Sequence, residues 1–237
     1  MGQSQAPDVF PEQGSEPNPP NVARSQRSAE RIAQRQEQIL ETAIRLFAEH
    51  GYSETDTQQL AEELRVGKGT IYRYFPSKRD LFLAAADHIM REMRKSIDAK
   101  IEGIEEPFER LGVAIRAFLG FFATHPQFVE LLIQERAQFK DRKKPTYFVH
   151  RETNIKRWQA LYRSLIEVGR IRNIPVERIT DVMSNLLYGT MFTNYFTGDQ
   201  ANVEKQAEDI LDIVFHGILS DAERRHRADH EPSRHSS

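Results

Sequence analysis

A cluster of basic side chains lies between Arg65 and Arg79. The window contains five basic residues and no acidic one, namely Arg65, Lys68, Arg73, Lys78 and Arg79. Ammonium and guanidinium groups at this density neutralise phosphates and release their counterions, so the chemistry that they suit is binding to nucleic acid. The chain as a whole has a formal net charge of −2, so such binding must depend on this local patch.

Other candidate chemistry in the sequence is weak. The chain has no cysteine, which excludes disulfides, cysteine-bound metals and thiol catalysis. His88 and Glu92 share a helix face, as do Asp209, Asp212 and His216, but neither group has a second convergent cluster. Without a phosphate loop or a nucleophile elbow, we expect no catalytic residue, no metal site and no cofactor. An all-α enzyme with a carboxylate–histidine metal centre stays open as an alternative class.

The basic cluster coincides with two short helices that run into a longer one. The pattern predicts helices over Thr57–Leu64 and Lys68–Tyr74, with Asp56 as the N-cap of the first. Ser77 then begins a longer helix. Apolar residues are spaced to pack the two short helices at a steep angle, which predicts a helix-turn-helix. These residues are Leu60, Ala61, Leu64, Val66 and Ile71.

The strings AIRLFAEHGYSETD and VGKGTIYRYFPSKRDLF carry a specific pattern of residues in register. Its members are Leu46, Phe47, Gly51, Tyr52, Thr55, Leu60, Ala61, Val66, Gly69, Thr70, Tyr72, Tyr74, Phe75, Ser77, Lys78 and Leu81. In this register the segment resembles the N-terminal domain of the TetR family of bacterial regulators. The resemblance implies a sequence-specific transcriptional regulator that binds double-stranded DNA. Most of the family repress, so the resemblance implies a repressor and no enzyme.

The resemblance also implies roles for individual DNA-binding residues. The head of the first short helix, at Thr55 or Asp56, is expected to lie near phosphate. The second short helix is expected to face the major groove with Lys68, Gly69, Thr70 and Arg73. Tyr72 and Tyr74 are expected to position that helix, with a phenol on phosphate. Lys78 is expected to contact phosphate from the head of the following helix.

Two residues of the turn depart from the family pattern. Arg65 stands where the family usually has Gly, so it must adopt the turn conformation at a cost of roughly 1 kcal/mol if that conformation is left-handed. Gly67 stands where Ser or Thr is usual, which removes a hydroxyl cap. We expect the motif to tolerate both changes, and we count Arg65 among the DNA-binding residues because it could gain a phosphate contact.

The last two expected helices are too apolar to have only one covered face. Seven of the ten residues in Ile210–Leu219 are apolar, and Val182–Phe196 carries no charge. Such helices need cover on two sides. This predicts a homodimer through residues of about 175–196 and 202–220, and hence a palindromic operator. Burial within a monomer stays open as the alternative.

Aromatic residues are abundant on the helices expected to surround the centre of the larger domain. As a group they predict a pocket for a small, largely apolar effector that releases the protein from DNA. Core packing is the alternative for any single one of them. The expected pocket residues are Phe118, Phe121, Phe122, Phe128, Trp158, Tyr162, Asn185, Phe192 and Tyr195.

The predicted fold is all-α, with an N-terminal three-helix helix-turn-helix domain and a larger helical domain. Further helices are expected at about 77–100, 107–123, 126–139, 149–169, 175–196 and 202–220, and no strand is expected. The expected boundaries are a disordered tail at 1–28, the DNA-binding domain at 29–76, the effector-binding and dimerisation domain at 77–220, and a disordered tail at 221–237.

No segment of the sequence has the length and apolar character of a signal peptide core or a membrane span. We therefore expect a cytoplasmic protein without a membrane partner. A helical adaptor whose helix-turn-helix has lost its DNA affinity stays open as a third class of function.

Overall fold

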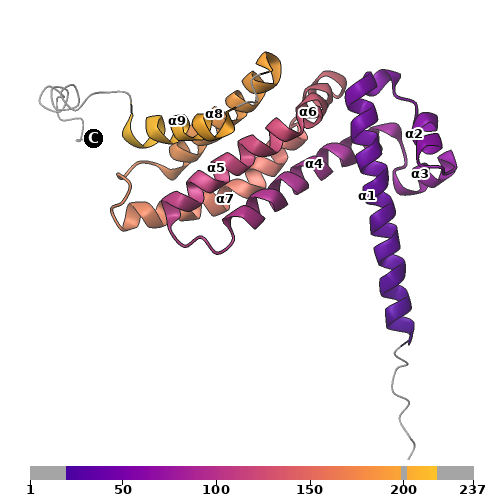
Figure 1. Ribbon diagram of the computed structural model, residues 1–237, viewed down its shortest axis with the longest axis horizontal. Coiled ribbons are helices and arrows are strands. Elements are labelled where there is room, and N and C mark those ends of the chain that lie inside the picture. Colours follow the sequence, from indigo (N-terminus) through magenta and orange to yellow (C-terminus); the bar gives the residue numbers. More distant parts are fainter. Residues whose placement is uncertain (1–19, 199–201, 218–237) are drawn as a thin grey trace, which may run out of the picture. The chain divides into compact units, whose positions relative to one another are not determined.

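The computed structural model describes residues 20–198 and 202–217. Within these residues it contains nine helices and no strand, which confirms the all-α prediction (Figure 1). In chain order the helices are α1 (Pro20–Glu54), α2 (Thr57–Glu63), α3 (Lys68–Tyr74), α4 (Lys78–Ile101), α5 (Pro107–Thr124), α6 (Pro126–Gln138), α7 (Thr146–Glu167), α8 (Val176–Thr197) and α9 (Val203–His216).

Two compact units divide the chain after Gln38. In the first unit α1 begins at Pro20, inside the segment 1–28 that we expected to be a disordered tail. Proline suits the first turn of a helix, and the Arg, Gln and Glu residues that follow are good helix formers. The expected C-terminal tail at 221–237 lies outside the described residues, as do residues 218–220 of the last expected helix.

The second unit begins with the part of α1 that packs on α2 and α3. The chain leaves helical geometry at Gly51, whose φ of +81° is easy for glycine, so α1 is interrupted there. Asp56 caps α2, because its carboxylate accepts a hydrogen bond from the Gln58 N–H at 2.8 Å. Ser77 caps α4 by accepting from the Asp80 N–H at 3.1 Å. Both caps confirm the sequence prediction.

The expected domain boundary at 76/77 does not separate two cores. The ring of Phe139, at the end of α6, lies 5.0 Å from the Tyr52 ring and 5.4 Å from the Phe82 ring. In addition, the Gln134 side-chain amide of α6 donates to the Phe47 carbonyl at 3.0 Å. One continuous core therefore joins the helix-turn-helix to the helices that follow it. Helix α6 supplies apolar cover that α1, α2 and α3 lack by themselves.

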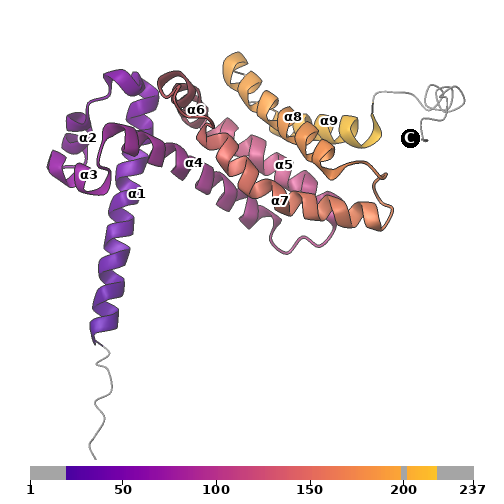
Figure 2. The ribbon, with the colours of Figure 1, turned by 180° about the vertical axis from the view of Figure 1, so that it is seen from behind.

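Helix α5 lies at the centre of the larger helical part, where it contacts α4, α6, α8 and α9. Helices α4, α5 and α7 run side by side in both views, with α8 packed on α5 and α7 (Figures 1 and 2). As expected, Pro107 and Pro126 are the first residues of α5 and α6. Pro175 is the N-cap of α8, one residue before the helix begins.

Candidate DNA interface and effector cavity

Helix α3 is held to the protein by one buried side chain and presents the others. Ile71 is its only fully buried residue. Gly69, Tyr72 and Arg73 are exposed, while Lys68, Thr70 and Tyr74 are half-buried. A short helix anchored on a single side leaves the opposite side able to enter a groove, which is the geometry by which helix-turn-helix proteins read DNA.

The turn before α3 contains the left-handed residue that the sequence analysis anticipated. Arg65 has a φ of +52°, the only positive φ of a non-glycine residue in the described part of the chain. Its N–H donates to the Glu62 carbonyl at 3.0 Å, and the Val66 N–H donates to the Ala61 carbonyl at 2.9 Å. These bonds offset part of the backbone strain. The Arg65 side chain is exposed, so it is available to a ligand.

The start of α3 is open to a close approach. Gly67 is the N-cap, and no side chain bonds to the first N–H groups of the helix. A methyl group added at Gly67 or at Gly69 would meet nothing within 4 Å. Neither glycine is therefore needed for packing within the chain, and both leave room for the backbone of a partner at this surface.

Polar contacts fix α3 against α2. The Tyr72 hydroxyl lies 3.0 Å from the Thr57 hydroxyl, and the Lys68 ammonium lies 3.2 Å from the Asp56 carboxylate. The Gln58 N–H and, after it, the Lys68 ammonium lower the pKa of Asp56. Lys68 thus points along the exposed edge of the two helices while remaining 41% exposed.

Three further residues among those expected to bind DNA are also engaged within the protein. Thr55 is buried, and its hydroxyl donates to the carbonyls of Leu46 and Gly51, so it does not present an oxygen or proton to phosphate. Lys78 donates to the Ser53 carbonyl at 2.9 Å and lies 4.9 Å from the centre of the Tyr52 ring. The half-buried Tyr74 lies under the Arg73 guanidinium, 5.3 Å from its ring centre. Of the pair Thr55 and Asp56, only Asp56 is exposed at the head of α2.

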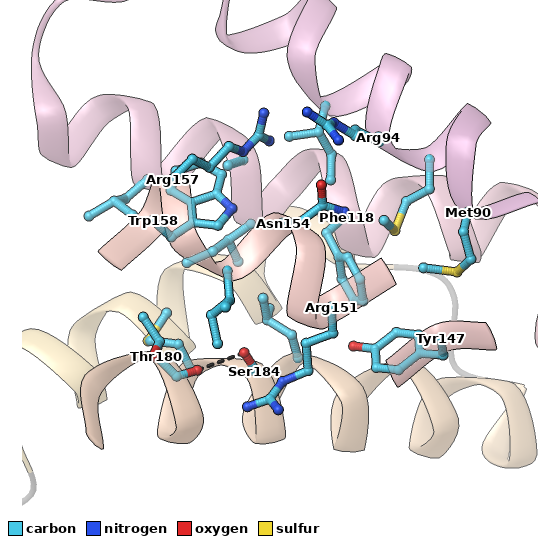
Figure 3. A pocket seen from close by; sticks show the side chains of 18 of the residues that line it. Met90, Arg94, Phe118, Tyr147, Arg151, Asn154, Arg157, Trp158, Thr180 and Ser184 are labelled. Carbon is cyan, nitrogen blue, oxygen red and sulfur yellow. Dashed lines mark hydrogen bonds between the residues drawn. The ribbon is translucent and has the colours of Figure 1, made fainter. Parts of the chain in front are cut away.

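A cavity of about 140 Å³ lies between α4, α5, α7 and α8 (Figure 3). Its walls are mainly apolar, with methionines from α4 and α8, Phe118 from α5, and Trp158 and Tyr162 from α7. Burial raises the pKa of Tyr162 to about 12. Of the nine residues that the sequence analysis assigned to an effector pocket, Phe118, Trp158 and Tyr162 line this cavity.

The other six expected pocket residues lie elsewhere. Phe121 and Phe128 pack on one another, with ring centres 5.4 Å apart, at the junction of α5 and α6. Tyr195 donates its hydroxyl to Glu130, which raises the pKa of Tyr195 to about 12. Asn185 is exposed, whereas its neighbour Ser184 faces the cavity. Phe122 packs against Phe118 and Phe192 against Tyr188, outside the cavity lining.

The charged and amide side chains that line the cavity were not predicted from the sequence. Arg94 of α4 and Arg151, Asn154 and Arg157 of α7 all line it, together with Ser184 of α8. Charged residues on an amphipathic helix usually mark its solvated face, so these arginines gave no signal as pocket residues. The spacing of three residues between Arg151, Asn154 and Arg157, next to Trp158, is the signal that places them along one side of α7.

The described residues form neither a membrane-spanning helix nor a metal-binding cluster. Among the described helices, none combines the length and the hydropathy needed to cross a bilayer. In residues 20–198 and 202–217, no three His, Asp or Glu side chains gather closely enough to hold a metal ion.

Known bacterial regulators are similar in sequence to this chain. Residues 39–85 match the family described as bacterial regulatory proteins, tetR family. The chain is 36% identical over 87 residues to the HTH-type transcriptional regulator HbdR of Aromatoleum sp. (strain CIB). This alignment covers 37% of this chain and 38% of that protein. It is 33% identical over 174 residues to the uncharacterized HTH-type transcriptional regulator YerO of Bacillus subtilis (strain 168), which covers 70% of this chain and 58% of that protein.

These alignments span less than two thirds of the length of either curated relative. Both relatives are named as transcriptional regulators and neither as an enzyme. Among solved structures, the transcriptional regulator FadR from Bacillus subtilis in complex with stearoyl-CoA is similar, with a TM-score of 0.64 and 18% identity over 77% of this chain and 99% of that one. At this identity the likeness shows a shared fold. The match shows that residues 39–85 belong to the family of bacterial regulatory proteins named tetR, and the chain shares the helical fold of the FadR structure.

Proposed function

We propose that this protein is a sequence-specific DNA-binding repressor that a small effector releases from its operator. The observation that carries the proposal is α3 itself, whose one fully buried residue is Ile71 and which presents basic and polar side chains on its open side. Lys68, Gly69, Thr70, Tyr72 and Arg73 form the proposed reading surface. A regulator of this kind acts where the chromosome lies, so we place it in the cytoplasm.

Contacts to the DNA backbone are proposed for the residues around that surface. Arg65 lies on the exposed turn after α2, where it is free to meet phosphate, whereas Asp56 at the head of α2 caps that helix and pairs with Lys68. Lys78 reaches phosphate only by giving up the Ser53 carbonyl, and Tyr74 acts through its contact with Arg73. We assign Thr55 a structural role, because its hydroxyl closes the turn after Gly51.

We further propose that the protein acts as a homodimer through α8 and α9. Large apolar side chains are exposed on these two helices, which is unusual for a surface in contact with water. Phe196 is 71% exposed and Ile213 is 48% exposed. Val182, Leu186 and Phe215 extend the exposed apolar surface of the same helices. A two-fold dimer places two α3 helices on DNA and calls for an operator that is a palindrome.

Helix α4 offers the route by which an effector acts on DNA binding. It begins at Lys78, directly after the helix-turn-helix, and its Met90, Met93, Arg94 and Ile97 form one wall of the cavity. A ligand that binds better to one position of α4 shifts the position of α3, because a ligand can bias a conformational equilibrium only through such a difference in affinity.

The test is selection of bound duplexes from random DNA, followed by affinity measurements at several salt concentrations. We expect a palindromic consensus and an affinity that falls steeply with salt. Lys68→Ala is expected to weaken binding and, if Lys68 neutralises one phosphate, to reduce the salt slope by about 0.9. Lys95→Ala is the matched control, since Lys95 is 70% exposed on α4 and lies outside the reading surface.

The adaptor alternative predicts a different result in the same experiment. A helical adaptor without DNA affinity gives no enriched sequence at any salt concentration. A consensus without two-fold symmetry contradicts the proposed dimer while leaving DNA binding in place.

A further inference from the structure

Two guanidinium groups at one end of the central cavity share a single carboxylate. Asp98 pairs with Arg157, and its other oxygen lies 3.5 Å from the Nε atom of Arg94. Both arginines line the cavity, and Figure 3 shows their head groups beside the Asn154 amide at one end of it. One positive charge at this end is therefore not compensated by the described ion pairs. Arg151, by contrast, has its own carboxylate, Asp181, at 2.6 Å.

The same end of the cavity holds two buried polar atoms without a partner in the described part of the chain, of which one, Asn154 Oδ1, is an acceptor and the other is a donor. The Nε atom of Arg157 is buried and has no hydrogen-bond partner in the described part of the chain. An unsatisfied buried donor is costly, more so when it carries charge, and a ligand that supplies an acceptor removes that cost. Of the described residues that line the cavity, none is acidic, and the one carboxylate that pairs with both arginines, Asp98, lies outside the lining. These features favour a ligand with an anionic head.

The position of the arginines sets the direction in which a ligand enters. Arg94 is 47% exposed and Arg157 is 33% exposed, so their end of the cavity reaches the solvent. The walls beyond them are mainly apolar, with Phe118, Met183 and the Trp158 ring, and their polar groups come from Arg151, Thr180 and Ser184. A ligand with a charged head at the arginines thus buries an apolar body beneath them.

The volume of the cavity limits the size of that body. At about 140 Å³ it is close to the roughly 150 Å³ of an apolar protein cavity that holds one benzene molecule. A long acyl chain, such as that of the stearoyl-CoA bound by the similar FadR structure, needs far more room. The cavity therefore suits a compact aromatic or short branched group.

We propose that the effector of this protein is a small carboxylate with a compact apolar or aromatic body. Its carboxylate accepts hydrogen bonds from Arg157 and Arg94, whose planar forks match the two oxygens of a carboxylate. The Asn154 amide lies within the same site. This inference rests on the proposed function, since it assigns the ligand of the proposed effector cavity.

Trp158 provides a direct readout of the site. It is the only tryptophan in the chain, it lines the cavity, and the Arg157 guanidinium lies 4.9 Å from its ring centre. Its fluorescence is to be recorded during titration of the full-length protein with aryl carboxylates such as benzoate and phenylacetate, with their neutral amides, and with straight-chain carboxylates of increasing length. We expect the aryl and short-chain acids to change the emission and raise the melting temperature, and the amides to do neither.

Variants of the arginines test the assignment of the head group. Arg157→Gln and Arg94→Gln are each expected to lower carboxylate affinity roughly ten- to hundredfold, as the loss of a charge-assisted hydrogen bond does. Arg157→Lys keeps the charge and should restore part of the affinity. Arg163→Gln is the matched control, because Arg163 is exposed on the same helix outside the cavity lining, and it should bind as the wild type does.

Each contrary outcome overturns a defined part of the inference. Amides that bind as tightly as their acids, or an Arg157→Gln variant with unchanged affinity, overturn the carboxylate site. Affinity that is highest for the longest chains overturns the limit on size. If no carboxylate binds while the DNA selection yields a palindrome, the inference fails and the proposed function stands. If carboxylates bind but no DNA sequence is enriched, the carboxylate site stands and the proposed function fails.

Discussion

Replacing Glu135 by leucine is expected to destabilise the protein strongly. Glu135 lies in α6 with a side chain that is only 1% exposed. Its carboxylate accepts hydrogen bonds from the Thr146 N–H at 2.9 and 3.1 Å and from the Thr146 hydroxyl at 3.0 Å, and it pairs with Arg142. This one carboxylate therefore fixes the start of α7 and the loop that precedes it.

The expected loss can be estimated from these contacts. Removing the carboxylate leaves the buried Thr146 N–H without an acceptor, at about 1–3 kcal/mol. Breaking a buried ion pair costs about 3–5 kcal/mol. Because Arg142 is 26% exposed and water can solvate part of its charge, the ion pair contributes less than this range, and we expect a total loss of about 3 kcal/mol. For a chain of this size the melting temperature should then fall by about 6–12 °C.

Thermal unfolding followed by circular dichroism measures this change, at one protein concentration because the proposed dimerisation would shift apparent stability. Glu152→Leu is the control, since Glu152 also pairs with a basic residue, Lys144, but is 55% exposed. Exposed pairs contribute little, so its melting temperature should stay close to that of the wild type. If the Glu135→Leu and Glu152→Leu variants have the same melting temperature, the reasoning from burial is refuted.

Three further predictions concern the turn, the dimer and alkaline pH. Arg65→Gly removes a left-handed strain of about 1–2 kcal/mol, but the added entropy of the unfolded chain costs about 0.4–1 kcal/mol of stability. The free energy of unfolding in urea should therefore rise by about 0.5–1 kcal/mol. A fall in this free energy contradicts the account. Phe196→Lys and Ile213→Lys should each convert the proposed dimer into monomers in sedimentation velocity, and an unchanged mass rules out the α8–α9 interface. Burial of Tyr162 and the hydrogen bond from Tyr195 to Glu130 raise both pKa values to about 12, so only the unfolded chain loses these protons from pH 10 upward. The melting temperature should therefore fall as pH rises from about 10 to about 12. The melting temperature of the Tyr162→Phe variant should fall less steeply over the same range.

Local rules were enough to predict the helices. Pro107 and Pro126 are first helical residues, Gly169 follows α7 with a φ of +73°, and Ser77 caps α4. Each of these signals depends on a backbone preference of one residue and on its immediate neighbours. The start of α1 at Pro20 was missed, because polar composition suggested disorder although the residues themselves favour a helix.

The cavity could not be predicted in the same way. Periodicity shows that a residue such as Phe121 or Phe122 is buried, but it does not show which neighbouring helix the residue meets. That depends on how α5 is rotated between four partners, which is a property of the whole packing. Arg157 was missed for the converse reason, since an arginine at a cavity mouth has the same sequence pattern as one on a solvated face.

The packing of Phe139 against Tyr52 and Phe82 has a consequence for building hybrid regulators. A natural place to exchange sensor modules between relatives is the junction after residue 76, where the DNA-reading helices end in sequence. A chimera cut there takes the Phe82 ring from one parent and its cover from another, and so leaves a gap beneath the DNA-reading module. The exchangeable module must instead retain its own α6 ending, from Gln134 to Phe139, so the smallest portable DNA-reading part of this protein is discontinuous in sequence.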